Sequence, residues 1–144
     1  MKFTSILLLA FLLAAPKAFS QVFVSYYQSS IPFAGIGYEF RRFAPELRVA
    51  TNVFVDDISA EFVLPYKVVS KEDYFVDAGL GYRYNIFRGL VLPVGFTAYP
   101  FPKKGMGFHA ELALISDFQS SALLRGSWGI AYRFGGKSNA AVVE

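Results

Sequence analysis

The sequence predicts an all-β protein, an eight-stranded antiparallel up-and-down transmembrane β-barrel. Three observations lead to this fold class. The chain has 144 residues, which suffices for one domain. Its apolar residues alternate with polar ones at period two over segments of roughly 8 to 13 residues, a strand length that crosses a bilayer when tilted. The connections between these segments are too short to hold crossover helices, so the sheet is expected to be an antiparallel meander.

Residues 1–20 stand apart from the predicted barrel. Lys2 gives a positive start, the run from Ile6 to Ala15 is apolar but too short to cross a bilayer, and Ala18-Phe19-Ser20 places small residues where a signal peptidase cleaves. We interpret 1–20 as a secretory signal peptide, 21–134 as the β-barrel domain and 135–144 as a flexible C-terminal tail.

Composition excludes several function classes. Without Lys2 and Lys17 the chain keeps 14 − 2 = 12 basic residues against 11 acidic ones, a net charge of +1, so the charge does not indicate a nucleic-acid partner. The absence of cysteine means that an exported domain of this size holds together without disulfides. Aromatic residues make up 18% of the chain and the mean hydropathy is +0.38, yet no apolar run after the signal peptide reaches the roughly 20 residues of a spanning helix.

Eight strands are expected in order along the mature chain, each with an apolar face that carries no charge. The fourth shows the pattern most clearly, because Ile58, Ala60 and Phe62 alternate with Ser59, Glu61 and Val63. Pro65 and Pro93 each remove a ladder donor, so local bulges are expected near them. The expected strands cover Val22 to Gln28, Ala34 to Phe40, Leu47 to Val53, Ile58 to Val68, Tyr74 to Tyr84, Leu90 to Ala98, Met106 to Leu114 and Ala122 to Phe134.

The residues opposite the apolar faces indicate which face points outward. They are mostly Gly, Ala, Ser, Val and Pro with isolated charges, which suits a narrow lumen better than a water-covered surface. Aromatic residues gather at strand ends, as in an interfacial girdle. One girdle would comprise Tyr38, Phe40, Tyr66, Tyr74, Tyr99, Tyr132 and Phe134, and the other Phe54, Tyr82, Tyr84 and Phe87. A soluble, lipocalin-like periplasmic barrel that binds an apolar ligand remains the alternative, with the faces inverted.

Hairpin arithmetic predicts ion pairs inside the barrel, because opposed residues in an antiparallel hairpin have a constant sum of residue numbers. Turns centred between Phe43 and Ala44, on Glu72 and on Phe118 each set opposite charges across from one another. The predicted pairs are Glu39 with Arg48, Arg41 with Glu46, Glu61 with Arg83, Lys67 with Asp77, and Glu111 with Arg125. A neutralised lumen is expected, since buried charges are tolerated when paired.

The last strand carries a resemblance. The stretch SWGIAYRF resembles the C-terminal insertion signal of bacterial outer-membrane barrels, with Ser127, Gly129, Tyr132 and Phe134 at the signal positions. The mature chain is similar to the small eight-stranded outer-membrane barrels of the OmpA-transmembrane and OmpX type. This resemblance implies recognition by the outer-membrane assembly machinery of a Gram-negative cell. The chain departs from the family in its tail after Phe134 and in its very short loops.

The sequence predicts no catalytic, cofactor-binding or metal site. His109, Glu111 and Ser127 could be cast as base, orienting carboxylate and nucleophile, but Glu111 is assigned to Arg125, and the lumen would not admit a lipid substrate. We therefore expect a non-enzymatic outer-membrane protein with a closed, charged interior, a structural or interaction component of the cell envelope. Its expected partners are outer-membrane lipid and lipopolysaccharide, or another membrane barrel or envelope protein. A small porin-like channel is a further alternative.

Overall fold

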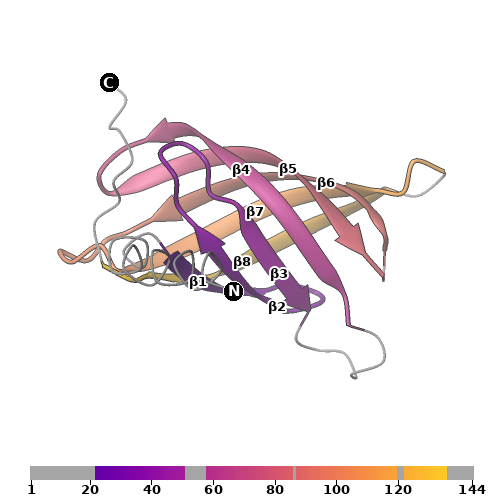
Figure 1. Ribbon diagram of the computed structural model, residues 1–144, viewed down its shortest axis with the longest axis horizontal. Helices are drawn as coiled ribbons and strands as arrows, with labels where there is room; N and C mark the ends of the chain where they lie inside the picture. Colours follow the sequence, from indigo (N-terminus) through magenta and orange to yellow (C-terminus); the bar gives the residue numbers. More distant parts are fainter. Residues whose placement is uncertain (1–21, 51–57, 86, 120–121, 136–144) are drawn as a thin grey trace, which may run out of the picture.

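Every strand of the computed structural model pairs with its neighbours in sequence, and the first pairs with the last, so the sheet closes into a barrel (Figure 1). The structure describes residues 22–50, 58–85, 87–119 and 122–135. The predicted fold class, an all-β, eight-stranded antiparallel up-and-down barrel, is confirmed. The strands are β1 (Val22–Gln28), β2 (Phe33–Tyr38), β3 (Glu46–Ala50), β4 (Ala60–Ser70), β5 (Tyr74–Tyr84), β6 (Gly89–Ala98), β7 (Met106–Ser116) and β8 (Ala122–Arg133).

Several expectations fall outside this description. The predicted signal peptide 1–20 and residues 136–144 of the predicted tail lie outside the described residues, as do Thr51 to Val53 of the third expected strand. Phe40 lies beyond the end of β2, in the connection to β3. A search of the described part of the chain finds no helix with the length and hydrophobicity needed to cross a membrane.

The wall of the barrel is uneven in height. β1, β2 and β3 have 7, 6 and 5 residues, whereas β4 to β8 have 10 to 12. β1 ends at Gln28 opposite Trp128, while β8 extends a further six residues to Ala122. In Figure 1 the β7–β8 hairpin accordingly projects well past the β1–β2 hairpin. We call the end that holds Val22 and Arg133 the terminal end, and the opposite end the distal end.

The seam between β1 and β8 depends on a glycine. A Cβ added at Gly129 would lie 1.9 Å from the carbonyl oxygen of Tyr26 on β1, so a side chain there would push the two strands apart. A register shift close to Pro65 agrees with the expected bulge, whereas the expected bulge at Pro93 is not found. The strands pair in continuous register across Pro93, and the one register shift along β4 lies between Lys67 and Val69, just after Pro65. The backbone carbonyl of Pro65 accepts a hydrogen bond from Ala44.

Candidate functional site

The two faces of the wall differ in chemistry, as period-two alternation requires. Residues that point inward are buried, and ten of those described are charged, five acidic and five basic: Glu39, Glu46, Glu61, Asp77, Glu111, Arg48, Lys67, Arg83, Arg125 and Arg133. The outward positions of the eight strands carry no charged side chain. Large apolar residues there are exposed, up to 67% for Trp128 and 68% for Leu124. The barrel is therefore polar inside and apolar outside.

A central ion-pair network crosses the lumen. Arg48 on β3 contacts three carboxylates, Glu46 at 2.8 Å, Glu61 at 3.1 Å and Glu111 at 2.7 Å. Arg125 on β8 contacts Glu61 at 2.7 Å and Glu111 at 3.2 Å. The Arg48–Glu111 contact joins β3 to β7, which are not neighbours in the sheet. These bonds tie opposite sides of the wall together through the centre of the barrel.

Aromatic rings pack against the cations of this network. The guanidinium of Arg48 lies 4.8 Å from the ring centre of Tyr27, and that of Arg125 lies 4.5 Å from the ring centre of Phe33. Tyr27 also donates hydrogen bonds to the carboxylate of Glu46 at 3.2 and 3.3 Å. The rings fill the lumen and place the negative faces of their π systems against positive charge.

A second cluster closes the terminal end. Glu39, just after β2, contacts Lys67 at 2.6 Å and also accepts a hydrogen bond from Arg133. Burial would raise the pKa of Glu39, but these two cations hold it below its usual value. The Arg133 guanidinium lies 3.5 Å from the ring centre of Tyr99. Tyr99 is 2% exposed and faces the lumen, so its assignment to the outer aromatic girdle was wrong.

A cavity of about 30 Å³ separates the two clusters. Its lining includes Asp77, Thr97 and His109, and a space of this size holds about two water molecules. Thr97 Oγ1 and His109 Nδ1 lie 2.5 Å apart. Gly95 makes room here, because an added Cβ would lie 2.9 Å from both Asp77 Oδ1 and His109 Cε1. The cavity is too small for an apolar ligand of the size that binding pockets usually hold.

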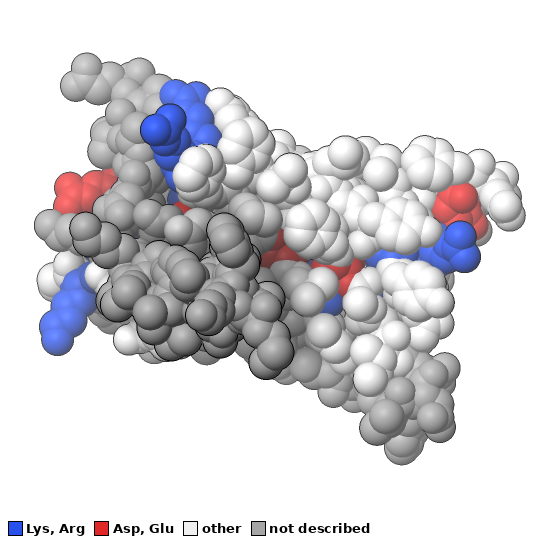
Figure 2. Space-filling view, viewed as in Figure 1, with Lys and Arg blue, Asp and Glu red and all other residues white. Residues whose placement is uncertain are grey.

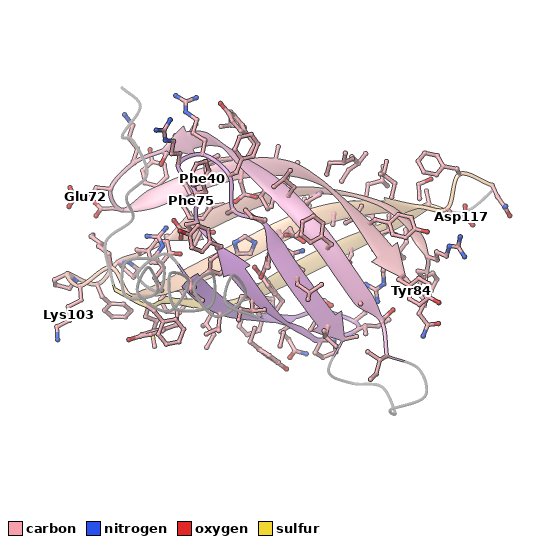
Figure 3. All side chains as sticks on the ribbon, in the orientation of Figure 1. Phe40, Glu72, Phe75, Tyr84, Lys103 and Asp117 are labelled. Carbon is pink, nitrogen blue, oxygen red and sulfur yellow. The ribbon has the colours of Figure 1, made fainter. Side chains whose placement is uncertain are left out.

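A wider hollow of about 670 Å³ lies at the distal end, between the β5–β6 and β7–β8 connections. Its lining includes Tyr82, Arg88, Asp117 and Phe118. Arg88 Nε donates a hydrogen bond of 2.8 Å to the hydroxyl of Tyr82. Figure 3 shows Asp117 and Tyr84 at this end of the molecule, opposite the end that holds Lys103 and Glu72. The hollow is open, so it offers a contact surface rather than an enclosed site.

The structure places β4 and β5 in the register that a turn centred on Glu72 predicts. Glu61 lies opposite Arg83, with Nη1 of Arg83 3.3 Å from Oε2 of Glu61. Lys67 lies opposite Asp77, but its ammonium group turns to Glu39 instead. The sequence thus placed this pair correctly across the hairpin and assigned the wrong partner to the lysine.

The register of β2 with β3 differs from the prediction. Phe40 and Phe43 face each other across a tight turn, with Arg41 at a φ of 49°, so the turn centre lies between Arg41 and Arg42. Gly35 therefore lies opposite Arg48, and Gly37 lies opposite Glu46. The predicted pairs Glu39 with Arg48 and Arg41 with Glu46 were wrong. Glu39 instead pairs with Lys67 and Arg133, and Arg41 lies on the surface beside the ring of Phe40.

β7 and β8 pair one residue away from the predicted turn centre. Ser127 lies opposite Glu111, and Arg125 lies opposite Ala113. Arg125 still reaches Glu111 at 3.2 Å, because its side chain is long enough to span the diagonal. Sequence reasoning missed Arg133, which ends β8 inside the lumen. Its inward parity with Arg125 and Ser127 was the available signal.

The residues of the predicted insertion signal lie on both faces of β8 and, for Phe134, just after its end. Tyr132 and Phe134 point outward and contact each other edge to face, with ring centres 5.3 Å apart. Ser127 points inward and is 6% exposed. Gly129 forms the close contact with β1. The strand thus combines an outward aromatic end with a glycine at the closing seam.

His109, Glu111 and Ser127 do not form a relay. Nε2 of His109 is 3.6 Å from Glu111 and has no hydrogen-bond partner among the described residues, and Oγ of Ser127 has none either. Glu111 is bound by Arg48 and Arg125. Ser127 and His109 are therefore not hydrogen-bonded to each other. No group of three or more His, Cys, Asp or Glu side chains that could hold a metal ion is present among the described residues.

Comparison with known proteins gives no relative. No protein-family model, no curated protein and no solved structure matches this chain. Its function must therefore be argued from the distribution of charge and apolar surface over the barrel.

Proposed function

We propose that this protein is a small outer-membrane β-barrel whose outer wall faces lipid and whose lumen is closed by ion pairs. It acts without enzymatic chemistry, as a structural or interaction component of the cell envelope. Both termini face the periplasm, and the distal end faces outward from the cell. The chain reaches the membrane after export and signal-peptide removal, and the assembly machinery recognises its last strand.

One observation carries the proposal: the barrel is apolar outside and charged inside. Apolar patches beyond a few hundred Å² are rare on soluble monomers and mark membrane or protein contacts. Here the apolar surface continues around the wall, with Ile36 on β2, Leu80 on β5 and Leu112 on β7 each more than half exposed. A hydrocarbon environment removes the cost of this exposure. It also requires a closed sheet, because an open edge leaves backbone groups unpaired in lipid.

The alternatives receive less support from the interior. A soluble carrier of an apolar ligand needs an apolar cavity, whereas the lumen holds ion pairs and a cavity of about 30 Å³. A porin-like channel needs an open path, whereas the central network and the Glu39 cluster both cross it. Eight strands also leave an interior that side chains can just fill.

With such short connections, the barrel would act by presenting its two ends and its outer wall to partners. A rigid wall holds the distal hollow at one membrane surface and the terminal connections at the other. Partners would be lipopolysaccharide at the distal end, or another membrane barrel or envelope protein that contacts the wall.

Fractionation of cells that express the full chain tests the proposal. We expect the protein in the outer-membrane fraction, and we expect the unboiled protein to migrate faster on a detergent gel than the boiled protein, because the closed barrel resists detergent. Recovery of folded protein from the soluble periplasm would refute the proposal.

A further inference from the structure

The two ends of the barrel differ in charge. Glu39 of the terminal connections is buried and paired with Lys67 and Arg133. The other charged residues of these connections are Arg41, Arg42, Lys71, Lys103 and Lys104 against Glu72 and Asp73, so 5 − 2 leaves a net charge of +3 outside the buried cluster. The described distal connections carry Arg88 and Asp117, which cancel. The connection 51–57 adds no basic residue in sequence. Figure 2 shows basic and acidic side chains at both ends in this view, with more of the basic ones at the end where Figure 3 labels Lys103 and Glu72.

A two-residue turn presents the strongest part of this charge. We call Phe40, Arg41, Arg42 and Phe43 the basic hairpin. The backbones of Phe40 and Phe43 exchange two hydrogen bonds of 2.8 Å, which fixes the turn. The amide of Lys67 on β4 donates to the carbonyl of Arg42 at 2.7 Å and anchors the turn to the barrel wall. The two arginines are thus held on a rigid support.

The aromatic residues of the hairpin lie on its outward side. Phe40 is 56% exposed, and Phe43 packs edge to face against Tyr66, an outward residue of β4, with ring centres 5.3 Å apart. Arg42 donates a hydrogen bond of 2.8 Å to the hydroxyl of Tyr66. Exposed rings beside cations suit the boundary between hydrocarbon and headgroups, where the rings meet acyl chains and the cations reach the phosphates.

No carboxylate among the described residues forms an ion pair with either arginine. Arg41 contacts the ring of Phe40, with 5.9 Å from guanidinium to ring centre, and forms no ion pair with a described residue. After its bond to Tyr66, Arg42 retains N–H donors in the fork geometry that matches phosphate. Lys104, by contrast, is paired with Asp73. The basic hairpin therefore offers two fixed guanidinium groups to an anion at membrane level.

We propose that the basic hairpin binds anionic phospholipid headgroups in the leaflet at the terminal end of the barrel. The ligand is a phosphodiester with net negative charge, such as phosphatidylglycerol, whose acyl chains lie against Phe40 and Phe43. This inference rests on the proposed membrane insertion. A lipid fits better than an acidic protein, because Phe43 packs against Tyr66 of the outer wall and so extends the apolar surface of the barrel to the arginines.

Spin-label spectroscopy of reconstituted vesicles tests the inference. The full mature chain is placed in phosphatidylcholine vesicles, and trace spin-labelled phosphatidylglycerol or phosphatidylcholine reports how strongly each lipid associates with the protein. We expect a roughly fivefold preference for phosphatidylglycerol, which falls at about 1 M salt, where the Debye length is about 3 Å. Arg41→Gln with Arg42→Gln should abolish this preference, and the matched pair Arg41→Lys with Arg42→Lys should retain most of it.

Arg88→Gln is the control at the distal end and should leave the preference unchanged. An equal association of the two lipids with the wild-type protein would overturn the inference, and so would an equal loss in Arg88→Gln and in the double glutamine variant. Arginine-dependent binding of an acidic protein without any lipid preference would assign the hairpin to that partner and refute the lipid site. Failure of the wild-type chain to enter vesicles at all would instead refute the proposed function.

Discussion

Glu61 is the carboxylate on which the central network depends, and Glu61→Gln is the sharpest test of the interior. Glu61 is 3% exposed and accepts from three arginines: Arg125 at 2.7 and 2.8 Å, Arg48 at 3.1 Å and Arg83 at 3.3 Å. The amide keeps the volume but removes the charge, which leaves buried guanidinium groups under-compensated. Removal of one partner of a buried ion pair costs about 3 to 5 kcal/mol. We expect the free energy of unfolding to fall by about 4 kcal/mol.

Urea unfolding in detergent, followed by the gel shift between folded and unfolded protein, measures this loss. With a slope of about 2 kcal/mol per M, the midpoint should fall by about 2 M. Glu72→Gln, in an exposed turn, is the matched control and should leave the midpoint unchanged. A similar midpoint for both variants would refute the reasoning. The exchange variant Glu61→Arg with Arg83→Glu should not recover stability, because the new arginine would lie between Arg48 and Arg125. Full recovery would mean that Glu61 and Arg83 act as an isolated pair.

Three further outcomes are expected. Gly129→Ala should weaken barrel closure and reduce the folded band on an unboiled gel, because its Cβ would lie 1.9 Å from the Tyr26 carbonyl oxygen. Gly126→Ala is the control and should be tolerated, since the atom nearest to its Cβ would be 3.7 Å away. Folded bands of equal strength for the two variants would contradict the role of Gly129. Deletion of Tyr132 to Glu144 should abolish outer-membrane insertion, and deletion of 136–144 alone should not, as cell fractionation can measure. If the protein that lacks Tyr132 to Glu144 still inserts, the end of β8 does not carry the insertion signal. The stability difference between wild type and Glu39→Gln should be full at neutral pH and should vanish as pH falls through the depressed pKa of Glu39, below its usual value of 4.5. Urea unfolding midpoints of the two proteins, measured across pH, check this prediction. A difference between wild type and Glu39→Gln that stays constant with pH would show that Lys67 and Arg133 do not hold Glu39 ionised.

The sequence predicted the eight strands and their inward faces, because alternation at period two is a local property of each segment. It also predicted the register of β4 with β5, since Lys71-Glu72-Asp73 leaves little choice of turn centre. The β2–β3 register failed because the turn could be centred at several places from Phe40 to Ala44. The structure selects the tight Phe40–Phe43 turn, and the change moves Glu39 away from Arg48.

The sums of residue numbers across hairpins could not predict the ion pairs that cross the lumen. That reasoning compares neighbouring strands, whereas Arg48 meets Glu111 across a separation of 63 residues and Arg125 meets Glu61 across 64. Which carboxylate an arginine reaches depends on the diameter of the barrel and on the rings of Tyr27 and Phe33 that fill it. Neither quantity can be obtained from the alternation of residues along one strand.

The long separation of these ion pairs has a consequence for how the chain is assembled. Arg48 and Glu111 can meet only after the five strands from β3 to β7 have paired. The central network therefore forms late in folding and stabilises the nearly complete barrel. In the unfolded chain, the ten charged side chains that the described barrel buries would be in water, where they favour solubility. An open sheet would carry these charges into hydrocarbon without the contacts that join Arg48 to Glu111 and Arg125 to Glu61 across the lumen. Under the proposed function, entry into the membrane and joining of β1 to β8 must therefore occur as one coupled event, and a chain stalled before that event remains a soluble client of the periplasm.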